Sequence, residues 1–243
     1  MSRPVDFVIV GLGNVDPTYA GTRHNAGYIF INYLANAMSM SSGADIRDTV
    51  FQTTFVAASS PESSTSTVMN SLRVVLVKPL TAMNECGQSV RKVLQHYAVT
   101  DFKKQLLVVC DDLNTLPGAL TLQSKSRQGN VFGGTLRSLA GHKGVESICS
   151  VLETTEFVRF RLGIGRPTEN ISIPDYVLSS IAKENKEMDL FGYVLEQTTA
   201  ALSEFAQTGD LQKVKKKYAS SKKIPKKMTE MVSLEFPVDV HGV

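Results

Sequence analysis

The chain has 243 residues, of which 42% are hydrophobic and 20% charged, and its formal net charge at pH 7 is +3. This length and composition are typical of a soluble globular protein with one domain. No apolar run approaches the roughly 20 residues that span a bilayer, which excludes a membrane-spanning helix, and we expect no membrane partner.

The first predicted strand and helix lie close to the N-terminus. An apolar run predicts a buried strand at residues 6–11, and apolar residues at helical spacing predict a helix at 23–38. Thr22 is available as the N-cap of that helix. A strand is predicted at 51–58, and the Ser- and Thr-rich stretch 58–67 predicts an exposed, mobile hairpin loop.

The middle of the chain continues the alternation of strands and helices. Residues 73–78 predict a buried strand, and residues 84–97 have the apolar spacing of a helix. Asn84 fits the N-cap of that helix. Residues 105–110 predict another central strand, which Asp111 follows directly.

The second half ends in a long helix. A short strand is predicted after Gly118, and the Gly-, Ser- and Asn-rich residues 126–135 predict a flexible loop. A helix at 141–152 and an alternating strand at 157–163 follow. A long amphipathic helix is then predicted at 184–209.

This order of elements predicts an α/β fold. We expect a single domain with a twisted, mostly parallel but mixed sheet, covered by helices on both faces, with some antiparallel pairing at the edges. Residues 1–210 are assigned to this domain. Residues 211–243 form a lysine-rich C-terminal segment and tail.

The positive charge is concentrated in one short stretch. Residues 213–227 hold eight lysines and no acidic residue; without them, 18 basic residues face 23 acidic ones, a net charge of −5. Such a stretch is either a solvated helix end and tail or a surface that attracts a phosphate backbone. The sequence leaves both alternatives open.

The cysteines and the N-terminus bear on the compartment. The three cysteines contain no C-x-x-C pair and are expected to be reduced; they are Cys86, Cys110 and Cys149. The N-terminus has no apolar signal segment. We expect a cytoplasmic protein, with the mitochondrion as an alternative.

Polar side chains follow three of the predicted strands. Asn14 and His24 lie in the loop after the first strand, Asn84 follows the strand at 73–78, and Asp111 follows the next one. Ligands in open α/β folds bind at the carboxyl ends of the strands, so parallel neighbours would bring these side chains together. A histidine beside an aspartate can act as a general base toward water. No G-x-S-x-G motif is present, so the predicted chemistry has no covalent intermediate.

Each of these residues also fits a purely structural role. His24 at a helix start can serve as a cap, Asp111 can stabilise a turn, and Asn84 fits an N-cap. Their shared position after strand ends is what favours the functional interpretation.

Two other classes of site fit less well. A dinucleotide-binding turn would need a third glycine where Asp16 stands. A metal site is not predicted, because the histidines form no H-E-x-x-H or cysteine-paired ligand set; they are His24, His96, His142 and His241.

Several blocks of sequence occur together in one known family. They are G-L-G-N and Y-A-G-T-R-H-N-A-G within 11–27, K-P-L-T-A-M-N-E-C-G-Q-S-V at 78–90, C-D-D-L-N-T-L-P-G at 110–118, A-G-H-K-G-V-E-S-I at 140–148, F-R-L-G-I-G-R-P at 160–167 and Y-V-L-S at 176–179. With these blocks the chain resembles the bacterial-type peptidyl-tRNA hydrolases over roughly residues 5 to 210. The resemblance implies a single α/β domain that cleaves the ester between peptide and tRNA and so recycles tRNA in translation quality control. We expect a monomer that needs no cofactor.

The resemblance also implies roles for the strand-end residues. His24 would be the general base, and Asp111 would orient it. Asn14 would help to distinguish peptidyl-tRNA from aminoacyl-tRNA. Asn84 would bind the substrate and help to position the attacking water.

The substrate-binding rim departs from the family pattern. By resemblance, Tyr19 lines the site for the tRNA end and Arg161 contacts a phosphate. Ala82 stands where the family has phenylalanine, and Lys143 replaces an asparagine that contacts substrate. Gln123 stands where a basic residue would accompany Arg161, although Lys125 and Arg127 lie nearby in sequence.

Two functions therefore remain for comparison. The first is hydrolysis of peptidyl-tRNA, which the retained Asn14, His24, Asn84 and Asp111 favour. The second is an RNA-binding protein that kept the fold without the reaction, which Ala82, Lys143 and the lysine-rich stretch would fit.

Overall fold

The structure is a computed structural model that describes most of the chain. The described residues are 5–37, 43–47, 51–56, 72–124, 131–132, 135–136, 141–167, 170–182 and 186–219. The predicted loop at 58–67 and part of that at 126–135 lie outside them. Among the helices described, none combines the length and apolar character needed to cross a bilayer.

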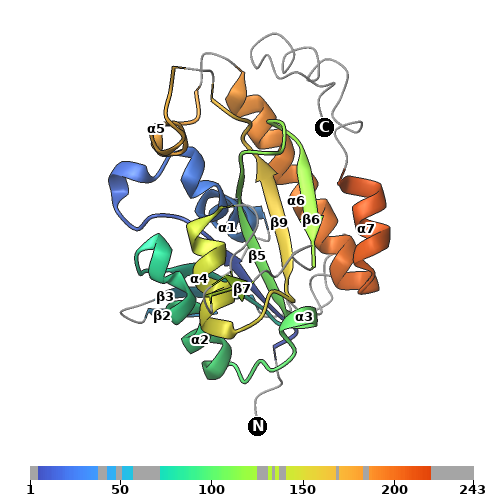
Figure 1. The fold of residues 1–243 in the computed structure, drawn as a ribbon. Helices are drawn as coiled ribbons and strands as arrows, with labels where there is room; N and C mark the ends of the chain where they lie inside the picture. Colours follow the sequence, from blue (N-terminus) through green and yellow to red (C-terminus); the bar gives the residue numbers. More distant parts are fainter. Residues whose placement is uncertain are drawn as a thin grey trace.

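A seven-stranded mixed sheet forms the centre of the molecule, in the order β2-β3-β4-β1-β5-β9-β6 (Figure 1). Its strands are β1 (Phe7–Gly11), β2 (Gly43–Arg47), β3 (Phe51–Val56), β4 (Val74–Pro79), β5 (Leu106–Asp112), β6 (Leu120–Gln123) and β9 (Val158–Gly163). The four inner strands β4, β1, β5 and β9 are parallel, and the flanking pairs are antiparallel. The predicted mixed α/β sheet is therefore confirmed.

Helices cover both faces of the sheet (Figure 1). They are α1 (Ala26–Ala37), α2 (Cys86–His96), α3 (Phe102–Gln105), α4 (Lys143–Leu152), α5 (Ile173–Leu178), α6 (Glu187–Thr208) and α7 (Leu211–Tyr218). On β1, Ile9 packs in the core beneath α1 and α6, whereas Val8 and Val10 pack beneath α2 and α4. Because both faces are covered, the inner strands are apolar on both sides.

The start of α1 lies directly on the sheet backbone. A Cβ at Gly27 would be 2.3 Å from the Leu12 nitrogen and 2.4 Å from the Val109 oxygen, and one at Gly11 would be 2.2 Å from the Gly27 oxygen. No side chain fits at those distances, so only glycine permits this approach. The approach fixes the turn before α1 against the ends of β1 and β5.

Two predicted helix starts differ from the structure. The helix predicted from residue 23 begins with a 3-10 turn, η2 (Arg23–Asn25), and Thr22 at its N-cap makes no side-chain capping bond; its hydroxyl donates to the Tyr19 carbonyl instead. The expected N-cap role of Asn84 is wrong, because Asn84 lies inside another 3-10 turn, η4 (Met83–Glu85). In both places a tight 3-10 turn precedes the α-helix, so neither polar side chain caps the α-helix itself.

Several short elements were not predicted. The strand β2 and the six-residue α5 lie in stretches without a clear period. A small hairpin of β7 (Val131–Phe132) and β8 (Thr135–Leu136) lies within and just beyond the stretch expected to be a flexible loop. Elements of two to six residues show too few repeats for periodicity to reveal them.

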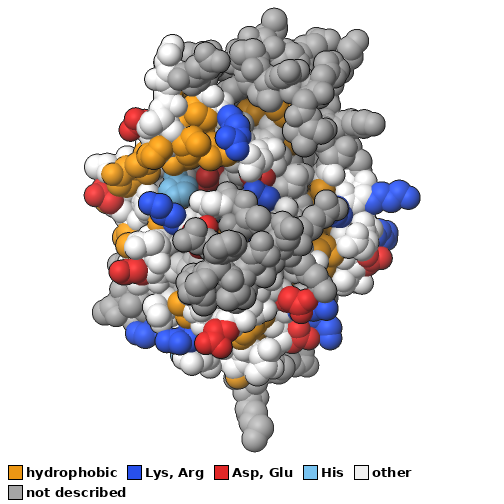
Figure 2. Space-filling view, viewed as in Figure 1, with side chains coloured by type: hydrophobic (Ala, Val, Ile, Leu, Met, Phe, Trp, Pro, Cys, Tyr) orange, Lys and Arg blue, Asp and Glu red, His pale blue; other side chains and the backbone are white. Residues whose placement is uncertain are grey.

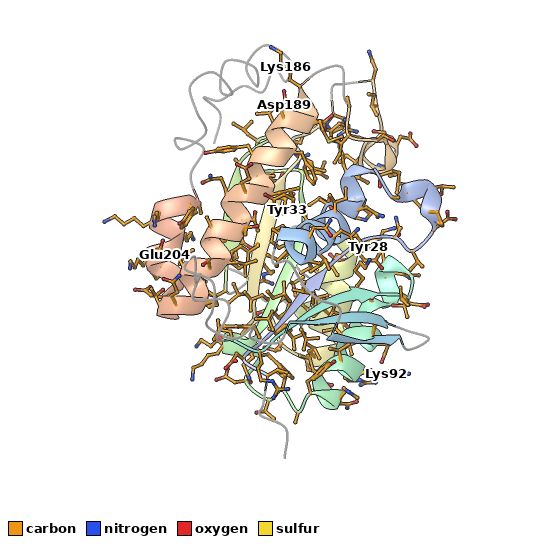
Figure 3. The ribbon with its side chains drawn as sticks, turned by 180° about the vertical axis from the view of Figure 1, so that it is seen from behind. Tyr28, Tyr33, Lys92, Lys186, Asp189 and Glu204 are labelled. Atoms are coloured by element: carbon orange, nitrogen blue, oxygen red, sulfur yellow. The ribbon has the colours of Figure 1, made fainter. Side chains whose placement is uncertain are left out.

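The lysine-rich segment begins as a helix packed on the domain. In α7, Val214 is fully buried in the core, and Lys213 and Lys217 pair with Glu204 of α6. Figure 3 shows Glu204 on the side of α6 that faces α7. Residues 220–243 lie outside the described residues, and they hold four of the eight lysines of the stretch 213–227.

Candidate active site

A cavity of about 640 Å³ opens at the carboxyl ends of the inner parallel strands. Its lining contains seven of the residues proposed from sequence: Asn14, His24, Ala82, Asn84, Asp111, Lys143 and Arg161. Tyr19 is half-buried and is not among the lining residues. Figure 2 shows the hollow beside a pale-blue histidine, with an apolar ridge and Lys or Arg side chains around it.

The turn that carries His24 is fixed to the loop after β1. The Asn14 backbone nitrogen donates to Asn25 Oδ1 at 2.7 Å, and Asn25 Nδ2 donates to the Asn14 carbonyl at 3.1 Å. Asn25 is buried and Asn14 is half-buried, so this pair of bonds is partly shielded from water. Only the backbone of Asn14 is used, which leaves its amide side chain for the cavity.

His24 and Asp111 form a hydrogen-bonded pair. His24 Nδ1 lies 2.9 Å from Asp111 Oδ1, and the histidine side chain is 15% exposed while the aspartate is 5% exposed. Burial alone would raise the pKa of Asp111, but the interactions with His142 and then with His24 outweigh it and hold that pKa well below its ordinary value. An ionised Asp111 accepts a hydrogen bond from the Nδ1–H group of His24, so Nε2 of His24 carries the lone pair that a general base needs.

Sequence reasoning missed a second histidine on the same carboxylate. His142 is the N-cap of α4, and its Nδ1 accepts from the backbone nitrogens of Gly144 at 3.1 Å and Val145 at 3.4 Å. The Nε2 of His142 is therefore protonated and donates to Asp111 Oδ1 at 3.1 Å. The available signal was its position in the A-G-H-K-G block, immediately before a predicted helix.

These three side chains also meet the distance requirement for a metal site. Ligand atoms of His24, Asp111 and His142 all lie within 4.8 Å of one another. A neutral imidazole has one lone pair, and that of His142 already accepts backbone hydrogen bonds at Nδ1. Its Nε2 has no lone pair for an ion beside Asp111. The hydrogen bonding therefore favours a general-base system over a metal centre.

Arg161 is held by a buried carboxylate. Its Nη2 donates to Asp112 Oδ1 at 2.6 Å, and both side chains are buried. Asp112 also accepts from the Asn114 backbone nitrogen at 2.9 Å and from the Thr115 hydroxyl. The charge of Arg161 at the cavity is therefore balanced within the protein.

Three of the predicted cavity residues are exposed, namely Ala82, Asn84 and Lys143. Asn84 projects from the 3-10 turn before α2, and Lys143 occupies the first turn of α4. No ion pair to Lys143 occurs among the described residues. A cation in the first turn of a helix is disfavoured by the helix dipole, so this position does not stabilise α4.

Apolar side chains of α5 cover one side of the cavity. They are Ile173, Pro174, Val177 and Leu178. Ser172 is the N-cap of this helix, its hydroxyl accepts from the Asp175 nitrogen, and a proline lies in the first turn. This serine, proline and acidic residue together form a helix-start signal from which α5, which was not predicted, could have been found.

Comparison with known proteins gives one consistent result. The family model described as peptidyl-tRNA hydrolase matches residues 8–227. A peptidyl-tRNA hydrolase of Bacillus subtilis is 35% identical over 178 residues, covering 73% of this chain and 81% of the relative. A peptidyl-tRNA hydrolase from an Exiguobacterium strain is 34% identical over 200 residues, covering 82% of this chain and 93% of the relative.

Solved structures agree with the sequence comparison. The crystal structure of peptidyl-tRNA hydrolase from Acinetobacter baumannii is similar with a TM-score of 0.65 and 26% sequence identity. The similarity covers 88% of this chain and 95% of that one.

Proposed function

Because the chain belongs to the peptidyl-tRNA hydrolase family, we propose that it cleaves the ester bond between peptide and tRNA with a water molecule activated by His24. The observation that supports this mechanism most directly is the hydrogen bond from His24 Nδ1 to Asp111. It leaves Nε2 as the basic atom at the cavity.

The proposed reaction has two proton transfers through one imidazole. Nε2 of His24 takes a proton from water as the water oxygen attacks the ester carbonyl carbon. Asp111 stabilises the imidazolium through the Nδ1 hydrogen bond. When the tetrahedral intermediate breaks down, the ribose 3′ oxygen leaves with the proton from His24. The products are free tRNA and a peptide with a carboxyl group.

The asparagines supply uncharged hydrogen bonds around this centre. Asn84 can hold the attacking water or the developing oxyanion, which an amide does without adding charge. The backbone of Asn14 is fixed by Asn25, so its side chain can contact the acyl group and help to distinguish peptidyl-tRNA from aminoacyl-tRNA. Ala82 and Lys143 border the cavity beside them, where we expect substrate contacts.

The remaining rim residues bear on the tRNA part of the substrate. We propose Tyr19 and Arg161 as contacts of the tRNA end, and a monomeric enzyme that needs no cofactor. It would act in the cytosol, with the mitochondrion as the alternative. Light scattering of the protein with bound tRNA measures its mass and so tests the monomer. Imaging of a fluorescent fusion shows the compartment in which the protein lies.

Replacing the proposed base tests the mechanism. In His24→Ala, hydrolysis of an N-acetylated aminoacyl-tRNA should slow about 10²- to 10⁴-fold, the usual contribution of a general base. The matched control is His96→Ala, an exposed histidine at the end of α2, which should retain full turnover.

Two results would contradict the proposal. Undiminished turnover in His24→Ala would remove His24 as the base. Wild-type protein that binds tRNA but releases no peptide would instead identify an RNA-binding protein without the reaction.

A further inference from the structure

A buried ion pair adjoins the catalytic turn. Arg23, the neighbour of His24, donates from Nε and Nη2 to the two carboxylate oxygens of Glu187, both at 2.6 Å. Glu187 is the first residue of α6, and both side chains are buried. A bidentate pair of this kind fixes the plane of the guanidinium as well as its position.

The third guanidinium nitrogen reaches the end of α5. Nη1 of Arg23 donates to the carbonyls of Tyr176 and Ser179, each at 3.3 Å, and to the Ser179 hydroxyl. The guanidinium also stacks on the Tyr176 ring, 4.3 Å from its centroid. The Ser179 hydroxyl in turn donates to the Tyr176 carbonyl at 2.8 Å.

Backbone hydrogen bonds join the same two segments. The Arg23 nitrogen donates to the Ser179 carbonyl at 3.2 Å, and the Ile181 nitrogen donates to the Gly21 carbonyl at 3.0 Å. An isolated bridge also pairs Thr22 with Ser180. The turn carrying His24 and the chain leaving α5 are therefore one hydrogen-bonded unit.

This unit lies between the general base and the apolar side of the cavity. His24 is the next residue after Arg23, and the nearest α5 side chains that line the cavity lie within one turn of Ser179. A buried ion pair is often no more stabilising than an apolar pair of equal size. What the guanidinium adds is direction, because its donors point at fixed angles to the start of α6 and to the end of α5.

We propose that Arg23 is a positioning residue that sets α5 relative to His24 through Glu187 and Ser179. Substrate binding beneath α5 and proton transfer at His24 then depend on one side chain. The inference rests on the proposed hydrolase function for its kinetic consequences, whereas the structural coupling can be measured without catalysis.

Two adjacent serines provide a matched test. Ser179→Ala removes one acceptor of the guanidinium and leaves the Glu187 pair intact, whereas Ser180→Ala changes an exposed hydroxyl that makes no hydrogen bond within the described part of the chain. A hydrogen bond to a charged group is equivalent to about tenfold or more in an equilibrium constant. We therefore expect about tenfold higher KM for peptidyl-tRNA in Ser179→Ala, a smaller change in kcat, and wild-type values in Ser180→Ala.

Arg23→Lys tests the role of the guanidinium geometry. Lysine keeps the charge opposite Glu187 but lacks the planar fork that pairs with both carboxylate oxygens while reaching the end of α5. Both KM and kcat should worsen in Arg23→Lys, while the pH dependence of kcat keeps its wild-type midpoint because no charge is lost. Equal kinetic constants in Arg23→Lys and wild type would overturn the proposal.

Hydrogen exchange gives a measurement that does not depend on turnover. In Ser179→Ala and Arg23→Lys, backbone amides of residues 173–179 and of 23–25 should lose protection together, and in Ser180→Ala neither should. Loss confined to 173–179 would overturn the coupling. If the wild-type protein hydrolyses no peptidyl-tRNA, the proposed function fails, and the exchange result still decides the coupling.

Discussion

At the scale of single residues, the site depends on one oxygen atom. Asp111 Oδ1 accepts from His24 on one side and His142 on the other. Each imidazole has its tautomer set by a different partner: His24 by the carboxylate, and His142 by the backbone at the start of α4. The carboxylate is thereby fixed in direction before any substrate arrives, which is the preorganisation that electrostatic catalysis requires.

The two functions of His142 can be separated by substitution. His142→Asn keeps a good N-cap for α4 but loses the bond to Asp111, whereas His142→Ala loses both. Removing a hydrogen bond to a charged group should lower kcat about tenfold or more in both variants. His142→Ala should be less stable than His142→Asn by about 1 kcal/mol in urea unfolding. Wild-type kcat in His142→Asn would contradict the role given to this bond.

The sequence revealed part of this arrangement. Asn14, His24 and Asp111 could be predicted to meet because each follows a strand that is visible in its apolar run. His142 could not, because its position depends on how α4 lies across the sheet, which no local pattern encodes. The N-cap role of Asn84 was predicted wrongly because propensity does not distinguish a cap from a residue one step inside a 3-10 turn.

At the scale of secondary-structure elements, an ion pair joins the carboxyl ends of β5 and β9. Strand β9 was predicted from its alternation, yet all six of its residues are buried, including Arg159 and Arg161. Arg161 pairs with Asp112 on β5, and the strands are also paired in parallel register. The alternation predicted the strand, and only the neighbouring strand shows why the charged Arg161 is buried there.

Breaking this pair should destabilise the protein. Arg161→Gln leaves Asp112 buried without its cation, which typically costs about 3–5 kcal/mol in the free energy of unfolding. Arg166→Gln is the matched control, since Arg166 is exposed and bonded to the neutral Asn114, and such surface changes cost at most about 0.5 kcal/mol. Urea unfolding measures both. Similar losses in the two variants would contradict the importance of burial.

At the scale of the whole molecule, the sheet and the helices that cover it could be predicted, whereas the packing of the C-terminal helix α7 could not. Strands and helices long enough to show a period were found at nearly their observed positions, which led to the mixed sheet. The lysine-rich segment was set apart by composition, yet α7 packs on α6 through Val214. Burial of a single valine within a charged helix is visible only in three dimensions.

The lysines beyond α7 provide a test of tRNA attraction. Lys213 and Lys217 are paired with Glu204, so we expect the attraction to come from the other six lysines of the segment. Four of these six lie beyond α7, namely Lys222, Lys223, Lys226 and Lys227. Replacing these four by glutamine should reduce the slope of log K against log salt for deacylated tRNA, by about 0.7–0.9 for each phosphate that the variant no longer neutralises.

A control with lysines elsewhere makes the result specific. Lys92 on α2 and Lys103 on α3 are exposed, and Figure 3 shows Lys92 far from the end of α6 that carries Lys186. Replacing both by glutamine should leave the slope unchanged. If the four-residue variant also keeps the wild-type slope, the segment is a solvated tail.

The close approach of Gly27 to Leu12 and Val109 bears on how this enzyme tolerates mutation. Any side chain at Gly11 or Gly27 would push the start of α1, and His24 with it, away from Asp111. Neither glycine has a group that could take part in chemistry. A substitution survey scored by activity alone would nevertheless rank both beside His24, the proposed general base. The set of indispensable positions in this protein thus includes residues defined by the atoms they lack.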